Sequence, residues 1–131
     1  MTVLPDSSIW VEYLRRGQQG TAWHLDALLR GGEVGTCGPV AAELIAGAAS
    51  ADRDELWSSL RALPWSPLGP AEWRLVGSSA GLLRDHGLTV ALTDIEIAVS
   101  ATAARFSVWT RDSDFRRVAT ILPDLKLYDE P

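Results

Sequence analysis

Short apolar segments alternate with longer helix-forming segments along the whole chain, and this alternation limits the possible folds more than any other feature. The predicted strands, rich in aliphatic, aromatic or β-branched residues, are 2–4, 34–37, 106–110 and 125–128, with 63–68 a strand or an extended link. Helices are predicted at 7–16, 21–30, 39–48, 52–63, 70–86 and 93–105, with a short one after Asp114. This order favours an α/β fold with a mainly parallel sheet.

The chain of 131 residues is of ordinary size for one domain, and neither a repeat nor a long linker divides it. We therefore expect residues 1–131 to form a single domain. One cysteine, Cys37, excludes an internal disulfide and gives no sign of an oxidising compartment. The first residues lack the basic region and apolar run of a signal peptide, and no apolar run could span a membrane. We expect a cytoplasmic protein without a membrane partner.

Several acidic side chains follow the predicted strands. Asp6 follows the first strand, and Asp112 and Asp114 follow the strand at 106–110, while Asp94 begins a helix and Glu43 lies one turn inside another. Parallel strands bring their carboxyl ends to one edge of the sheet, which is where ligands bind in such folds. Carboxylates gathered there repel one another unless a cation lies among them, and Mg²⁺ or Mn²⁺ prefers such oxygen ligands.

Each of these acids also has a purely structural explanation. Asp94 at a helix start is favoured by the helix dipole, and Asp6 is a candidate helix N-cap. Glu43 could be a solvated helix residue, and Asp112 and Asp114 could form an Asx-turn. Acids after strands are common in α/β proteins, so no single acid indicates a site. The structural explanations weaken only because the segments that carry these acids are expected to meet at one edge of the sheet.

Four stretches, taken in order, resemble the PIN-domain family, and more narrowly the VapC-like toxin ribonucleases of bacterial toxin–antitoxin pairs. They are DSSIWVEYL at 6–14, PVAAELIAG at 39–47, LTDIEIAVSATA at 92–103 and WTRDSDF at 109–115. The resemblance covers nearly the whole chain and implies a three-layer sandwich with a mainly parallel central sheet flanked by helices. It also implies a Mg²⁺- or Mn²⁺-dependent endoribonuclease acting on tRNA, rRNA or mRNA.

The resemblance assigns the site residue by residue. Asp6, Glu43, Asp94 and Asp112 correspond to the family's catalytic acids, which bind one metal ion or two. Asp114 is close enough in sequence to contribute directly or through water, and Glu43 could position either the metal or the attacking water.

Polar and basic neighbours complete the predicted site. Ser7, Ser8 and Thr110 are expected to support it. The chain departs from the family at Pro5, because proline cannot donate to the ladder, so we expect the first strand to end early.

The basic residues Arg111, Arg116 and Arg117 are candidates for RNA phosphates, with ordinary surface charge as the alternative. The net charge of −5 does not exclude RNA, because carboxylates bound to cations no longer repel phosphate.

The family further implies a homodimer and a cognate VapB-like antitoxin that lies in an apolar groove. Trp10, Tyr13 and Trp57 are groove candidates, with core packing as the alternative. His24 and His86 have no evident partner, and Cys37 is interpreted as a buried small hydrophobe.

Other functions fit the sequence less well. An acid-site phosphatase needs an aspartate pair after the first strand, where this chain has Asp6-Ser7-Ser8, and a receiver domain also needs an early acid pair. Neither histidine lies in a convincing context for a serine hydrolase. A PIN-like module that binds RNA or protein without cleavage stays open as the alternative.

Overall fold

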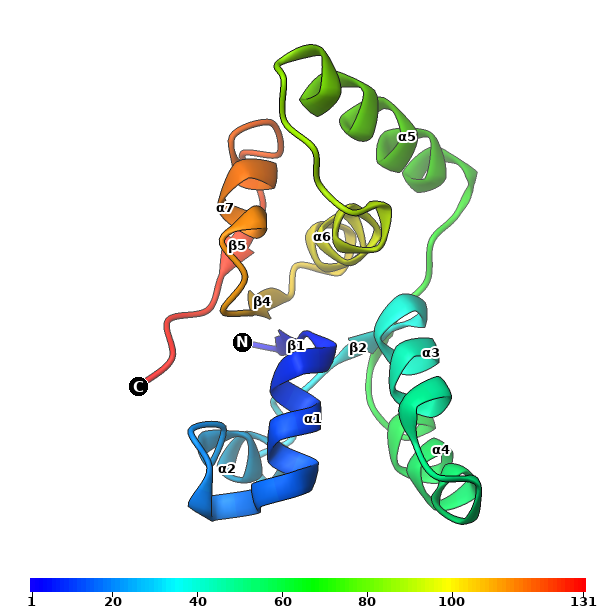
Figure 1. Ribbon diagram of the computed structural model, residues 1–131, viewed down its shortest axis with the longest axis vertical. Helices are drawn as coiled ribbons and strands as arrows, with labels where there is room; N and C mark the ends of the chain where they lie inside the picture. The colour runs from blue at the N-terminus through cyan, green and yellow to red at the C-terminus, as the bar shows by residue number, and fades with distance from the viewer.

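A parallel sheet forms the centre of the computed structural model, which describes residues 1–131 (Figure 1). Its strands are β1 (Val3–Pro5), β2 (Thr36–Cys37), β3 (Trp65–Ser66), β4 (Ser107–Trp109) and β5 (Lys126–Leu127). β1 pairs with β4 and β4 with β5, while β2 pairs with β3, all in parallel. A bridge between Val3 and Val34 joins the two groups, which places β1 between β2 and β4.

Helices flank this sheet on both sides. They are α1 (Ser7–Arg16), α2 (His24–Arg30), α3 (Gly38–Gly47), α4 (Arg53–Arg61), α5 (Pro70–Asp85), α6 (Leu92–Ala104) and α7 (Asp114–Ala119), with 3-10 turns at Gly17–Gln19 and Ser50–Asp52. In Figure 1, α1, α2 and α4 lie below β1, α3 lies beside β2, and α5 and α6 lie above β4. The α/β class, the parallel sheet and the flanking helices are therefore confirmed. None of the helices combines the length and the apolar character that crossing a membrane requires.

The first strand does not end early, so that expectation was wrong. Pro5 belongs to β1 and lies in register with Trp109 of β4. Strand residues alternate in the side to which they bond. Val3 bonds toward β2, through Glu33 and Gly35, while the Asp6 N–H donates to the Trp109 carbonyl at 2.9 Å. Pro5 therefore lacks its N–H only on the β2 side, and the ladder with β4 stays intact.

Asp6 is the N-cap of α1, as its structural explanation from the sequence expected, because its side chain accepts the Ile9 N–H. The start of α6 differs from the predicted one. α6 begins at Leu92 without a side-chain cap, so Thr93 lies inside the helix.

The predicted helix at 21–30 begins only at His24, and β2 to β5 are shorter than predicted. Side-chain patterns locate an element, but its ends depend on the tertiary hydrogen bonds available there.

The core lies between the sheet and both helical layers. Trp109 and Phe115 are its largest fully buried side chains, and every residue of α6 from Ile97 to Ala101 is buried. Because β4, α6 and α7 all pack into this one core, Asp94 and Asp114 are held on rigid helices, and Asp112 lies in the short loop between β4 and α7.

Candidate active site

The parallel register of β1 and β4 brings the first acidic residue against the last acidic motif. Pro5 lies opposite Trp109, so the next residues, Asp6 and Thr110, leave the sheet side by side. The Thr110 hydroxyl donates a hydrogen bond to Asp6 Oδ2, although 104 residues separate them in the chain. The ends of β1 and β4 therefore bring Asp6 and Thr110 together at one edge of the sheet.

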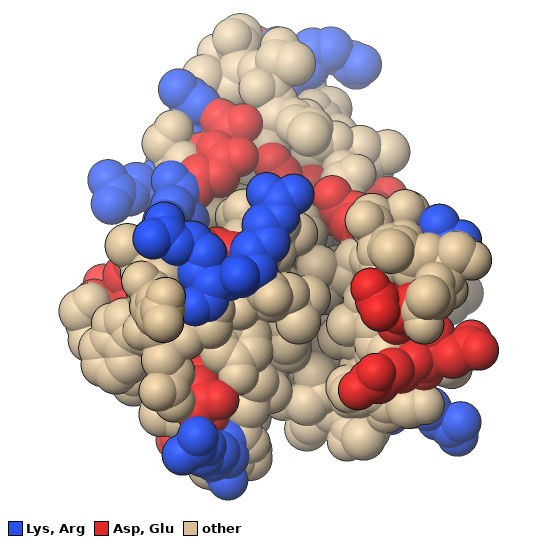
Figure 2. All heavy atoms as spheres, turned by 60° about the horizontal axis from the view of Figure 1, so that its bottom comes forward, with Lys and Arg blue, Asp and Glu red and all other residues tan.

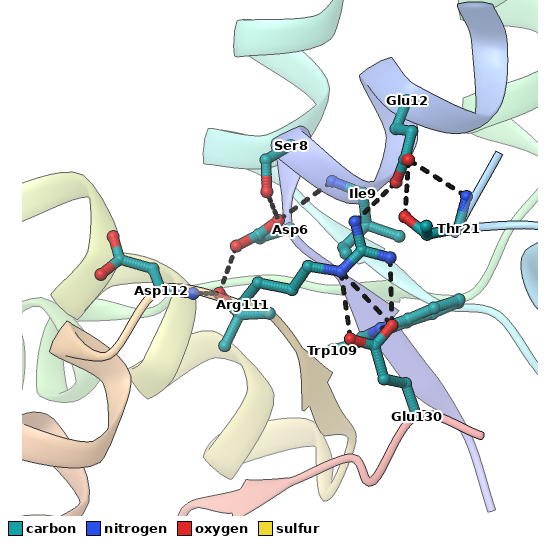
Figure 3. Close-up of polar contacts among 10 residues, drawn as sticks. Asp6, Ser8, Ile9, Glu12, Thr21, Trp109, Arg111, Asp112 and Glu130 are labelled. Atoms are coloured by element: carbon teal, nitrogen blue, oxygen red, sulfur yellow. Dashed lines mark hydrogen bonds and ion pairs between the residues drawn. The ribbon is translucent and has the colours of Figure 1, made fainter. Parts of the chain in front are cut away.

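Asp6 is buried and held by hydrogen bonds on both carboxylate oxygens. Its Oδ1 accepts the Ser8 hydroxyl at 2.6 Å and the Ile9 N–H at 3.2 Å, while Thr110 binds Oδ2 (Figure 3). Ser7 makes no side-chain hydrogen bond to Asp6. A carboxylate oxygen has two lone pairs, so Asp6 keeps some capacity to accept further ligands.

The segment after β4 is ordered by its own side chains. The Asp112 N–H donates to the Thr110 hydroxyl oxygen at 3.0 Å, and Asp112 Oδ1 accepts the Asp114 N–H at 2.9 Å. The second contact is the Asx-turn considered from the sequence. Phe115, fully buried, anchors the start of α7 in the core. Asp112 therefore has a defined position even though it is exposed.

Three carboxylates converge on one point. Oxygens of Asp94, Asp112 and Asp114 all lie within 4.8 Å of one another. The pKa of Asp94 is raised from 3.8 to about 6, first by burial and then by the charges of Asp112, Asp6, Asp114 and Glu43. Only oxygen donors are present and their charges repel, so the set fits a hard cation such as Mg²⁺ or Mn²⁺.

The two remaining predicted acids lie near this cluster but outside it. Asp6 and Glu43 are close enough for their charges to raise the pKa of Asp94. Neither belongs to the group of oxygens within 4.8 Å. Glu43 is exposed on α3, where its side chain is free to turn toward a ligand.

A second set of charged residues surrounds Arg111, and no sequence pattern connects them. Arg111 Nη1 lies 2.6 Å from Glu12 of α1, and Arg111 Nε lies 3.0 Å from Glu130 (Figure 3). Glu12 also accepts the Thr21 hydroxyl at 2.6 Å and the Thr21 N–H at 3.1 Å.

These contacts shift the pKa values of the partners. The Thr21 and Arg111 hydrogen bonds lower the pKa of Glu12 from 4.5 to about 2. Hydrogen bonds from Arg111 and Trp109 lower the pKa of Glu130, and both carboxylates raise the pKa of Arg111. Residues so far apart in sequence carry no local pattern that could reveal the contact.

The predicted RNA-binding arginines are in different states. Arg111 is occupied by Glu12 and Glu130, so its contact with RNA stays a prediction that requires those pairs to open. Arg117 pairs with Asp114, three residues earlier on α7, whereas Arg116 is exposed and makes no ion pair. On the face shown in Figure 2, several basic side chains lie together around a few acidic atoms, and most of the remaining surface is neither basic nor acidic.

The groove candidates separate into core and surface residues. Trp10 is only 5% exposed and belongs to the core, so the core alternative holds for it and the groove role does not. Tyr13 is half-buried and donates its hydroxyl to Asp26 at 2.7 Å, while Trp57 is 45% exposed.

Cys37 is buried, which raises the pKa of its thiol to about 11, so it is an unreactive core residue as interpreted from the sequence.

Comparison with known proteins agrees with this geometry. The family model of the PIN domain matches residues 3–121, which is most of the chain. The protein therefore belongs to the PIN-domain family. No curated protein sequence matches it significantly.

Solved structures share the fold at low sequence identity. The structure of VapBC2 from Rickettsia felis bound to a promoter DNA fragment has a chain with a TM-score of 0.72 and 20% identity, with 98% of each chain covered. FitAcB from Neisseria gonorrhoeae gives a TM-score of 0.68 at 21% identity, again with 98% of each chain covered. VapBC-1 from nontypeable Haemophilus influenzae gives 0.69 at 17% identity, with 98% of each chain covered.

Proposed function

We propose that this protein is a metal-dependent endoribonuclease of the VapC-like toxin group, which hydrolyses phosphodiester bonds in tRNA, rRNA or mRNA. The observation that carries the proposal is the convergence of Asp94, Asp112 and Asp114 beside Asp6. Carboxylates with a purely structural role would be expected to pair with basic side chains of the protein, as Glu12 pairs with Arg111. Here most of the negative charge is left for a cation from solution.

We assign the direct metal contacts to Asp94, Asp112 and Asp114, with Mg²⁺ or Mn²⁺ as the cation. Asp6 is a further ligand, or it holds a water of the metal, from its fixed position between Ser8 and Thr110. Glu43 is exposed above the site and is the candidate to orient the attacking water.

The proposed reaction is hydrolysis at phosphorus. Water oxygen forms a bond to phosphorus, the bond from phosphorus to the leaving ribose oxygen breaks, and one proton of the water passes to a base while the leaving oxygen is protonated. A bound divalent cation supplies the positive charge that activates the water and stabilises the leaving oxygen. The chain's own contribution is to hold the carboxylates in place, and the hydrogen bonds of Thr110 to Asp6 and Asp112 do so.

RNA phosphates require basic side chains beside this acidic centre. Arg116 is the best candidate, because it is exposed on α7, two residues after Asp114, and makes no ion pair. Arg117 and Arg111 could contribute only when their carboxylate partners release them. Binding through so few arginines should depend only weakly on salt, because the salt dependence grows with the number of phosphates that the protein neutralises.

We also propose a VapB-like antitoxin and a homodimer as partners, and a cytoplasmic location. Support for the antitoxin comes from the fold, since similar chains occur in the VapBC2 and FitAcB structures. The exposed Trp57 on α4 offers an apolar contact for such a partner.

Cleavage of structured RNA tests the proposal directly. Wild type, Asp94→Asn and Asp6→Asn are compared on tRNA and rRNA fragments with Mg²⁺ or Mn²⁺, and again with EDTA. Asp54→Asn is the matched control, because Asp54 is an exposed carboxylate on α4. We expect cleavage by wild type and the control, little by the two site variants, and none in EDTA.

Two results would overturn the proposal. Equal cleavage by wild type and both site variants would show that the acidic site is not responsible. RNA binding without cleavage by any protein, in either metal, would favour a PIN-like module that binds RNA or protein without cutting it.

A further inference from the structure

Arg111 is held by two carboxylates that come from opposite ends of the chain. Glu12 lies on α1, and Glu130 lies three residues beyond β5. Glu130 contacts both Nε and Nη2 of Arg111, at 3.0 and 3.1 Å, while Nη1 contacts Glu12 at 2.6 Å. Arginine's rigid fork suits this arrangement, because it fixes the guanidinium plane as well as its position.

Arg111 stands between two residues of the proposed active site. Thr110, before it, binds Asp6 and the Asp112 N–H, while Asp112, after it, joins the carboxylate cluster. In Figure 3 the side chain of Arg111 extends away from Asp112, toward Glu12 and Glu130. The loop at 110–112 is therefore held in place at two points. Thr110 binds Asp6, and Arg111 binds Glu12 and Glu130.

The segment that carries Glu130 is itself attached to β4. The Tyr128 N–H donates to the Val108 carbonyl at 2.7 Å, and Trp109 Nε1 donates to Glu130 Oε2 at 3.1 Å. Trp109 is fully buried, so this second contact ties Glu130 to a rigid part of the core. Glu130 thus holds the last residue of β4 and Arg111 through one carboxylate.

We propose that Glu130, together with Glu12, is a positioning residue for the proposed reaction: through Arg111 it fixes the loop that presents Asp112 to the metal. This inference rests on the proposed function. Partly exposed ion pairs contribute little to folding stability. Removing residues that orient metal ligands lowers metal affinity, so the effect is expected at the metal site rather than in the fold.

The test measures Mn²⁺ binding by calorimetry and amide hydrogen exchange by NMR, without RNA. Glu130→Gln keeps an oxygen for Trp109 but loses the ion pair, and Glu12→Gln does the same for Thr21. Asp129→Asn is the matched control, because it removes one negative charge from the adjacent exposed residue, which makes no ion pair. Protected amides of α6 report whether each variant is folded.

We expect each Gln variant to weaken Mn²⁺ binding about tenfold. The Asp112 and Asp114 amides, which are bonded to Thr110 and Asp112, should exchange faster in both variants. The control should stay close to wild type in both measurements.

The inference is overturned if both Gln variants match Asp129→Asn in Mn²⁺ affinity and in amide exchange. That result would leave the proposed function untouched. If wild type binds no Mn²⁺, the metal part of the proposed function fails, and amide exchange decides the positioning role. Unchanged exchange at Asp112 would then overturn that role too, and faster exchange would support it.

Discussion

Two groups of carboxylates lie near the loop after β4, and their electrostatic environments are opposite. On one side, Asp94, Asp112 and Asp114 face one another, and the pKa of Asp94 is raised to about 6. On the other side, Glu12 and Glu130 share Arg111, and the pKa of Glu12 is lowered to about 2. The same functional group is neutralised by the protein in one place and left largely unneutralised in the other.

The difference shows which carboxylates are available for a ligand. A carboxylate that already accepts an arginine and a hydroxyl gains little from a cation. Carboxylates that repel one another gain much, because a cation relieves the repulsion as it binds. The Arg117–Asp114 pair offsets only part of the charge of the cluster. The comparison therefore separates carboxylates whose charge is open to a cation from carboxylates that are paired within the protein.

The largest expected difference is in RNA cleavage. Asp94→Asn should reduce the rate by more than about 100-fold, because it removes a ligand, whereas Glu12→Gln should cost at most about tenfold through the loop. Initial rates on one RNA at saturating Mn²⁺ measure both. Equal losses in the two variants would mean that the two groups do not differ in function.

The second difference is in stabilisation by metal. Mn²⁺ at 100 times its Kd should stabilise wild type by about 2.7 kcal/mol, and raise its melting temperature by about 10 °C. Asp54→Asn should show the same rise and Asp94→Asn nearly none. Thermal denaturation with and without Mn²⁺ measures this, with Ca²⁺-free buffer and EDTA as the baseline. A full rise in Asp94→Asn would place the cation elsewhere.

The third difference is in pH dependence. Asp94 must lose its proton to bind metal, so Mn²⁺ affinity should fall as the pH drops through about 6. In the metal-free protein, Asp94 has a pKa of about 6 when folded and its ordinary pKa of 3.8 when unfolded. Between these two pH values the folded state binds the proton and the unfolded state does not, so the contribution of Asp94 to stability falls as the pH rises through that window. Glu12 behaves oppositely: its contribution is present above 4.5 and is lost as pH falls toward 2.

Calorimetric titrations with Mn²⁺ from pH 5 to pH 7.5 measure this dependence. Asp94→Asn should abolish it, and Glu12→Gln should leave its midpoint unchanged. A midpoint near 4 in wild type would show that burial and the neighbouring charges do not raise the pKa of Asp94.

The smallest expected difference is in the stability of the metal-free protein. Asp94→Asn should stabilise it at pH 7 by about 0.5 kcal/mol, after solvent screening, or roughly 2 °C in melting temperature. Glu12→Gln should lower the melting temperature slightly, because it leaves Arg111 with one partner fewer. Opposite signs in the same melting experiment would sharpen the comparison, and a loss of stability in both variants would contradict it.

The sequence predicted much of the site because its acids follow strands directly. Asp6 and Asp112 come right after β1 and β4, so knowing that the sheet is parallel is enough to bring these two near each other. Asp94 lies in the first turn of α6, which no strand precedes, so its approach to them depends on how α6 packs. Phe115 could be assigned to the core by its apolar character, and it is fully buried.

Other features could not be predicted because they depend on side-chain reach between distant segments. Glu12 and Glu130 meet at Arg111 only because α1 and the segment after β5 pass the same end of β4. Trp10 could belong to a groove or to the core, and only the packing of α1 shows that it is buried. Pro5 kept its place in β1 because its missing N–H faces away from β4, which no local pattern reports.

The sequence by itself determined the α/β class, the order of the elements and the acids at the strand ends, since periodicity and residue type are local properties. The tertiary structure decided which of those acids share one point, which are paired with arginine, and how Thr110 joins Asp6 to Asp112. Charge interactions depend on distances of a few ångströms between segments far apart in the chain, and only the folded packing sets those distances.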